Sequence, residues 1–323
     1  MYEARIPELD GIRAISILLV LATHLLPLGP AQFQINFMTG LMGMSLFFCL
    51  SGFLITRMLF ENLDVRTFLI RRFARIYPLL IVYAVLVAGI AMDRWDATAG
   101  ILFGYINYDD SILFRGTSHL WSICVELHFY LAIALAVLLM GRRGFWLVPL
   151  AALVVLGLHV STGTYVSIRT HLRVGEILSG SILALIWLHQ DHPWVMAFRR
   201  VVTLGFLPLE LAWLTSCHEI GGSVQYLRPY LAMSVVGAVI FMAEGRIRSF
   251  CRNGSLRYIA GISYALYVWH PMTALGWLGT GGDWERYLIK RPISFALTFV
   301  LAHVSTNTGE AYFIRLVRRR RGG

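Results

Sequence analysis

Two polar residues stand in the first apolar segment of the chain, Arg13 near its start and His24 near its end. Eleven residues make about three helical turns, which places both side chains on one face, about 16 Å apart along the axis. An arginine in the hydrocarbon region costs about 2.5–3.5 kcal/mol on insertion scales, so its presence indicates function. His24 could act as a general base on a hydroxyl, because imidazole titrates near neutral pH. The alternatives are a lipid-facing anchor for Arg13 and a structural role for His24.

A second candidate site is the basic segment RRFARIYP at residues 71–78. Arg72 and Arg75 are three residues apart and share one face if the segment is helical. The planar guanidinium group matches phosphate oxygens, so this face could hold a phosphorylated ligand. The alternative, which the segment taken alone favours, is an ordinary basic loop beside the membrane that also contacts anionic lipid.

Glu126 lies deep in an apolar block, where an unpaired carboxylate is very unfavourable. It needs a cation, a hydrogen-bond donor or a proton, and His119 lies two turns earlier on the same helical face. A structural ion pair is the alternative to catalysis here. The remaining polar residues in apolar surroundings are candidates for substrate binding, together with His119: Ser51, Arg173, Glu176 and His270.

Each of these further candidates has a simpler explanation. Arg173 and Glu176 are three residues apart and could neutralise one another. His270 could lie in an aromatic belt at the membrane interface, between Trp269 and Trp277. Gly52 and Gly180 indicate close helix packing rather than chemistry.

The composition requires a membrane around these residues. Of the 323 residues, 57% are hydrophobic and 14% are charged, whereas a soluble domain carries about 25% charged residues. We expect one transmembrane domain over residues 1–323, with a basic cytoplasmic tail at residues 316–323.

The net charge of +10 comes from arginines spread between apolar blocks, so it indicates topology rather than a nucleic-acid partner. The four cysteines have no metal-ligand spacing, and no metal is expected.

Apolar blocks of about the length that crosses a bilayer recur along the whole chain. We predict an all-α bundle of about ten transmembrane helices, with a short re-entrant or interfacial segment at residues 97–108. With both termini in the cytoplasm, only eight of the 28 basic residues fall outside, which agrees with the positive-inside rule. The predicted spans are 12–28, 38–60, 78–92, 119–140, 145–160, 174–189, 201–215, 229–243, 258–278 and 292–308.

At these residues the sequence resembles acyltransferase family 3, bacterial inner-membrane enzymes that O-acylate sugars, polysaccharides, lipids and antibiotics. The similar segments occur in the family's order between about residues 6 and 271. They read IPELDGIRAISILLVLATH, GMSLFFCLSGFLIT, FLIRRFARIYPL, HLWSICVELHFYL, RVGEILSGSILA and GISYALYVWHP.

The resemblance implies a membrane-bound acyltransferase in the bacterial inner membrane that uses acyl-CoA as its donor. By matching position, Arg13 and His24 correspond to the family's essential pair, and Glu126 to its conserved acid. Arg72 and Arg75 correspond to its cytoplasmic basic motif. The chain departs from the pattern at residues 127–128, where Leu and His replace a second acid and Gln. It also lacks the Arg-Pro that follows the position of Glu310, so a role for Glu310 is doubtful.

Our hypothesis is that acyl-CoA, expected to be acetyl-CoA, docks on the cytoplasmic side through Arg71, Arg72, Arg75 and Tyr77. Its thioester would then reach His24, with Glu126 or Glu176 orienting the imidazole ring. A carbohydrate or glycolipid hydroxyl would accept the acyl group. Direct transfer and an acyl-histidine intermediate both remain open, as do the acyl length and the acceptor.

Three other functions also fit buried Arg, His and Glu. The first is a secondary transporter or lipid flippase, although such proteins tend to have paired halves and we find no internal repeat. The second is a different membrane acyltransferase fold that uses histidine and an acidic partner. The third is a non-catalytic membrane scaffold, which the buried charges argue against.

Overall fold

In the computed structural model, residues 6–30, 32–242, 244–310 and 312–313 are described, and their only regular secondary structure is helical. The predicted tail at residues 316–323 lies outside these ranges. The α-helices are α1 (Pro7–Leu25), α2 (Asn36–Glu61), α3 (Val65–Tyr83), α4 (Trp95–Leu102), α5 (Trp121–Met140), α6 (Leu147–Thr162), α7 (Thr170–Arg173), α8 (Gly175–Leu188), α9 (Pro193–Leu204), α10 (Phe206–Ser216), α11 (Arg228–Phe241), α12 (Arg246–Cys251), α13 (Gly254–Trp269), α14 (Asp283–Glu285) and α15 (Arg291–Ser305).

Short 3₁₀ and π turns connect or extend these helices. The π turns are Ala84–Ala91, Arg286–Lys290 and Thr306–Glu310. The 3₁₀ turns are Ile106–Tyr108, Asp110–Ile112, Ser118–Leu120, Gly141–Trp146, Glu219–Leu227, Met272–Ala274 and Gly276–Gly279.

Five helical segments of the described chain are long and apolar enough to cross a membrane: Asn36–Glu61, Val65–Ala91, Ser118–Thr162, Glu219–Phe241 and Asp283–Gly309. The longest, Ser118–Thr162, contains α5 and α6, which are connected by the turn Gly141–Trp146. At Gly141 a φ of 57° favours glycine. The protein is therefore an all-helical, multi-pass membrane protein.

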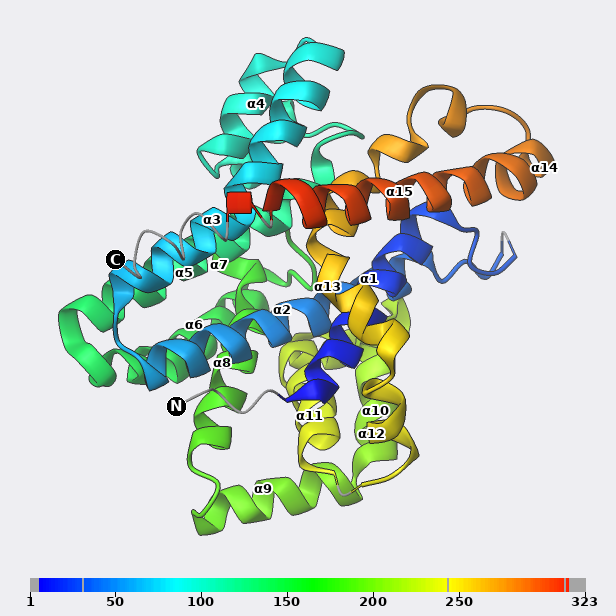
Figure 1. Cartoon of the computed structure of the whole chain (residues 1–323). Helices are drawn as coiled ribbons and strands as arrows, with labels where there is room; N and C mark the ends of the chain where they lie inside the picture. Colours follow the sequence, from blue (N-terminus) through cyan, green and yellow to red (C-terminus); the bar gives the residue numbers. More distant parts are fainter. Residues whose placement is uncertain (1–5, 31, 243, 311, 314–323) are drawn as a thin grey trace.

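The predicted span at residues 201–215 differs from the structure. The chain bends at Gly205, which ends α9, and α10 begins at Phe206. Figure 1 shows α9 lying across one end of the bundle, at a steep angle to α10. Because α10 has 11 residues, it is shorter than the roughly 20 residues that cross a bilayer.

The centre of the bundle is formed by α1, which packs against α2 and α13 (Figure 1). Helix α2 also crosses α8 at very short range. A Cβ atom at Gly52 would come within 1.8 Å of the Ile177 carbonyl oxygen, and one at Gly180 equally close to that of Cys49. Glycine at both positions allows the two backbones to touch, as the sequence predicts. This contact fixes Ser51, the neighbour of Gly52, within the interior.

Candidate active site

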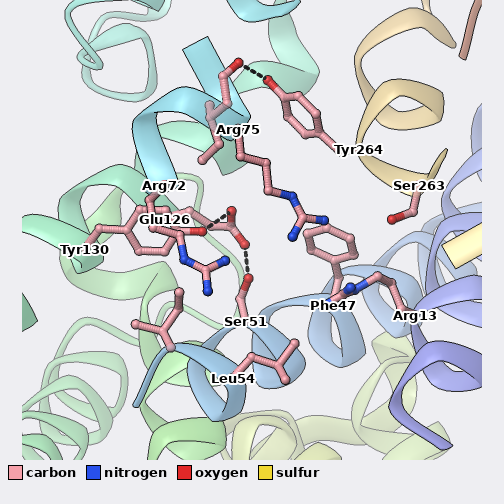
Figure 2. Close-up of a pocket in the computed structure, with 12 residues that line it drawn as sticks. Arg13, Phe47, Ser51, Leu54, Arg72, Arg75, Glu126, Tyr130, Ser263 and Tyr264 are labelled. Carbon is pink, nitrogen blue, oxygen red and sulfur yellow. Dashed lines mark hydrogen bonds between the residues drawn. The ribbon is translucent and has the colours of Figure 1, made fainter. Parts of the chain in front are cut away.

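A first cavity, the arginine pocket, encloses about 530 Å³, including space open to solvent. Five helices supply its polar lining: α1, α2, α3, α5 and α13. Figure 2 shows the guanidinium groups of Arg72 and Arg75 extending into the pocket from α3, while Arg13 reaches toward it from α1. The polar lining residues are Arg13, Ser51, Arg72, Arg75, Glu126, Tyr130, Ser263 and Tyr264.

Glu126 is the acidic member of the arginine pocket. Ser51 donates a hydrogen bond to its Oε1, and the Tyr130 hydroxyl donates to its Oε2 over 3.0 Å (Figure 2). The charge of Arg13 is repelled by Arg75 and Arg72 and attracted by Asp10 and Glu126. Three guanidinium groups against one carboxylate give the pocket a positive balance that suits an anionic ligand.

Only two of the four residues predicted to bind the donor line the arginine pocket. Arg72 and Arg75 line the pocket, whereas Arg71 is exposed and does not line it. Tyr77 also points elsewhere, because its hydroxyl donates to the Leu102 carbonyl oxygen over 3.1 Å. The three-residue spacing of Arg72 and Arg75 explains why these two share the pocket.

A second cavity, the histidine cavity, encloses about 960 Å³ and is lined by His24, His119, Arg173 and Tyr267 among others. His24 stands in the last turn of α1, and its side chain keeps exposed surface because it faces this cavity. The His24 ring lies 5.0 Å from that of His270, which lies 5.2 Å from the ring of His119. The structure thus brings together three histidines that are far apart in the sequence.

Backbone contacts set the tautomers of the two inner histidines. His270 Nδ1 lies 2.7 Å from the Tyr267 carbonyl oxygen, and His119 Nε2 lies 3.3 Å from that of Val268. A carbonyl oxygen only accepts, so these nitrogens carry the protons in the neutral rings. The opposite nitrogens, His270 Nε2 and His119 Nδ1, are buried and have no hydrogen-bond partner among the described residues. Each ring therefore keeps one lone pair available inside the protein.

A wall separates the two cavities. Phe47 lines the arginine pocket and stacks at 6.4 Å on Tyr267, which lines the histidine cavity. The Tyr267 hydroxyl accepts a hydrogen bond from Ser122 over 2.6 Å and donates to the His119 carbonyl oxygen. Arg13 and His24, which we expected on one face of the first span, therefore line neighbouring cavities on either side of this wall.

Arg173 and Glu176 neutralise one another, as their spacing suggested, with 3.0 Å between Nη1 and Oε1. Arg228 is a third member that its sequence context does not indicate, and its Nε lies 3.4 Å from the same oxygen. All three side chains are only 3% exposed. Arg173 also lies over the rings of Phe48 and Trp121, at 5.7 and 5.4 Å, on the edge of the histidine cavity. Glu176 is thus engaged by arginines rather than by His24.

Other residues of the site were not identified from the sequence. Tyr130 and Ser122 stand one helical turn after and before Glu126, so the spacing of four residues was a usable signal. Arg228 stands directly before Pro229 and so falls just outside the predicted span at residues 229–243. Among the described residues, no group of three or more His, Cys, Asp or Glu side chains is placed to hold a metal ion.

The fold and the two cavities define a multi-pass membrane protein with a polar interior divided between a basic pocket and a histidine cluster. The family described as "Acyltransferase domain" matches residues 6–306, so the chain belongs to this acyltransferase family. No solved structure matches the chain.

Three relatives agree with this assignment. A Staphylococcus aureus (strain COL) protein, provisionally named an O-acetyltransferase, is 29% identical over 312 residues, which cover 82% of this chain and 50% of that protein. The peptidoglycan O-acetyltransferase OatA of Listeria monocytogenes is 27% identical over 315 residues, with coverages of 82% and 49%. The O-acetyltransferase OatA of Staphylococcus aureus (strain NCTC 8325) is 27% identical over 319 residues, with coverages of 84% and 51%. The chain spans about half the length of these relatives.

Proposed function

We propose that this chain is a membrane O-acetyltransferase that moves an acetyl group from acetyl-CoA to a hydroxyl of a carbohydrate-type acceptor. The observation that carries the proposal is the pair of adjoining cavities. One gathers Arg13, Arg72 and Arg75 around Glu126, and the other contains His24. The printed names of the relatives support O-acetyl transfer, and the name of one specifies peptidoglycan.

The arginine pocket is the proposed donor site. Phosphate oxygens of coenzyme A would bind the guanidinium groups of Arg72 and Arg75, with Arg71 on the exposed face of α3 adding to the attraction. In this proposal Tyr77 supports the segment through its bond to Leu102.

The histidine cavity is the proposed site of chemistry. His24 takes the proton of the acceptor hydroxyl while the oxygen attacks the thioester carbonyl carbon. The tetrahedral intermediate then expels the thiolate, which recovers the proton from the His24 imidazolium. The lone pair of neutral His270, in the adjacent ring, would accept the other N–H of His24 and hold its orientation. For the thioester to arrive from the arginine pocket, the contact of Phe47 with Tyr267 must open.

The proposed setting is the bacterial inner membrane, with both termini in the cytoplasm and about ten spans, including the crossings made by shorter helices. The arginine pocket would then open toward the cytoplasm, where acetyl-CoA is made, and the histidine cavity toward the outside. Two cavities on opposite sides of a wall would also fit a transporter. The family match favours acyl transfer.

Purified protein supplied with acetyl-CoA and a cell-wall polysaccharide acceptor tests the proposal. We expect thiol release that depends on the acceptor and falls by about 10²–10⁴-fold in His24→Ala. His192→Ala is the matched control, because His192 is exposed and outside both cavities. Unchanged thiol release in His24→Ala would contradict the assignment of His24, and uptake of a solute without thiol release would favour the transporter.

A further inference from the structure

A third cavity, the apolar groove, lies between α5 and α6, is bounded by α8 and has a volume of about 1550 Å³, including space open to the surroundings. Most of its lining is aliphatic. Ala132 and Ala136 stand one turn apart on α5, and Ala151 lies on α6. Small side chains at these positions leave the hollow, since a larger residue at any of them would occupy it.

The groove belongs to a membrane-spanning part of the protein, because α5 and α6 form the apolar segment Ser118–Thr162. It follows α6 from Leu147 to Leu158, which is about 16 Å at the rise of an α-helix. Leu150 and Val154, both in its lining, are 57% and 54% exposed. A hydrocarbon chain would fit this length and chemistry, and the groove is open to the side from which such a chain would enter.

One end of the groove is polar. His128 Nδ1 lies 2.7 Å from the Thr170 hydroxyl, and the Tyr108 hydroxyl lies 3.1 Å from His171 Nδ1. All four of these residues line the groove. No Asp, Glu, Lys or Arg is among its lining residues in the described chain. Hydroxyl and imidazole groups without a formal charge suit a neutral, hydroxylated head group rather than a phosphate.

The polar end adjoins the histidine cavity. Within one short segment, Ile168 lines the histidine cavity and Thr170 lines the groove. Asn107 holds this segment in place, with Nδ2 donating to the Ile168 carbonyl oxygen over 3.1 Å and to the Thr170 hydroxyl over 2.9 Å. The same stretch of chain therefore forms the partition between the apolar groove and the cavity of His24.

We propose that the acceptor is a lipid-linked saccharide whose hydrocarbon chain binds in the apolar groove while its neutral sugar reaches His24 past residues 166–171. This inference rests on the proposed function, because it names the class of acceptor for the same histidine cavity. The groove holds the chain through van der Waals packing, because a chain that enters from the bilayer is not transferred out of water. The polar end sets the depth of the sugar in the membrane.

A photolabelling experiment on the full chain tests the groove without requiring turnover. The protein is reconstituted in phosphatidylcholine vesicles and irradiated with hexadecyl glucoside that carries a diazirine in the middle of its chain. We expect saturable labelling of peptides that cover residues 129–136 and 147–158. Unlabelled hexadecyl glucoside should displace the label, whereas methyl glucoside and added phosphatidylcholine at the same concentration should not.

Variants of the groove sharpen the result. Ala136→Phe fills the hollow and should lower the labelling about tenfold by excluding the chain. Leu138→Phe is the matched control, because Leu138 is 69% exposed on the same helix but does not line the groove. Leu150→Trp, at an exposed lining position, provides a second test should Ala136→Phe fail to fold. Label spread evenly over all lipid-facing helices, or insensitive to competitor, would indicate ordinary bilayer lipid and overturn the inference.

Thiol release from acetyl-CoA is measured on the same preparations. Protein that releases thiol in a His24-dependent reaction but shows no saturable label refutes the groove alone. Protein that labels in the groove but releases no thiol with any acceptor refutes the proposed function alone.

Discussion

Glu126 and Glu176 are both carboxylates within apolar helices, yet the protein surrounds them differently. Glu176 is paired with Arg173 and Arg228, and all three side chains are only 3% exposed. Glu126 accepts hydrogen bonds from two hydroxyls and lies in an open pocket that arginines also line. The cluster around Glu176 is closed, and its arginines are engaged by Glu176 and by the Tyr165 and Ser216 carbonyl oxygens, whereas the open pocket with excess positive charge can accept a ligand. The difference separates a structural site from a binding site, although the two acids look alike in the sequence.

The largest loss of stability should come from removing one arginine from the closed cluster around Glu176. Arg228→Met removes one cation from Glu176 and the donor to the Tyr165 carbonyl oxygen, which it contacts at 2.8 Å. Arg173 still neutralises Glu176 in this variant, so the loss comes from the contacts that Arg228 makes to Glu176 and Tyr165. A hydrogen bond to a charged group contributes about 1.5–3 kcal/mol, and two such contacts are lost together. Thermal unfolding in detergent measures this loss. Arg200→Met, at an exposed position on α9, is the control and should leave the melting temperature unchanged. Equal stability of both variants would show that the cluster is not structural.

The second effect tests the open pocket. Arg75→Met should raise the KM for acetyl-CoA about 10–150-fold, since a hydrogen bond to a charged group contributes about 1.5–3 kcal/mol. The melting temperature should hardly change, in contrast to Arg228→Met. Arg66→Met, at an exposed position in the first turn of α3, serves as the control. An unfolded Arg75→Met protein, or an unchanged KM, would remove the distinction between the two clusters.

These two clusters also show which features of the site can be predicted from the sequence and which depend on tertiary packing. The buried charges, the Arg72–Arg75 spacing, and the close packing at Gly52 and Gly180 follow from residue type and helical period, and each of these was predicted. The wall formed by Phe47 and Tyr267 was not, because it depends on how α2 and α13 are rotated about their axes. The pairing of Arg228 with Glu176 depends on the packing of α11 against α8, which no local pattern records.

A smaller effect is expected at the hydrogen bonds that hold Glu126. Tyr130→Phe removes the donor to Oε2 and keeps the ring. The stability loss should be about 0.5–1.5 kcal/mol, the usual net contribution of one hydrogen bond. Double-mutant analysis with Ser51→Ala should give a combined loss larger than the sum of the single losses, because the second variant leaves the carboxylate without either hydroxyl. Simple additivity would show that the two donors act independently.

The smallest effect concerns a third acid, Glu8, which lies before the predicted first span and is paired at the rim of the bundle. Burial raises the pKa of its carboxyl, but a backbone hydrogen bond and the side chains of Arg248 and Arg252 lower the pKa overall. A lowered pKa stabilises the folded protein above the unfolded value of about 4.3, and this contribution is lost as the pH falls through the folded pKa. The melting temperature should therefore fall less between pH 6 and pH 3 in Glu8→Gln than in the unaltered chain.

Because both arginines are partly exposed and also pair with Glu244, solvent screening keeps this effect below that of Arg228→Met. If the melting temperatures of Glu8→Gln and the unaltered chain depend on pH in the same way, the pairing of Glu8 with Arg248 and Arg252 does not stabilise the fold. Only the closed cluster around Glu176 would then stabilise the fold through its charges.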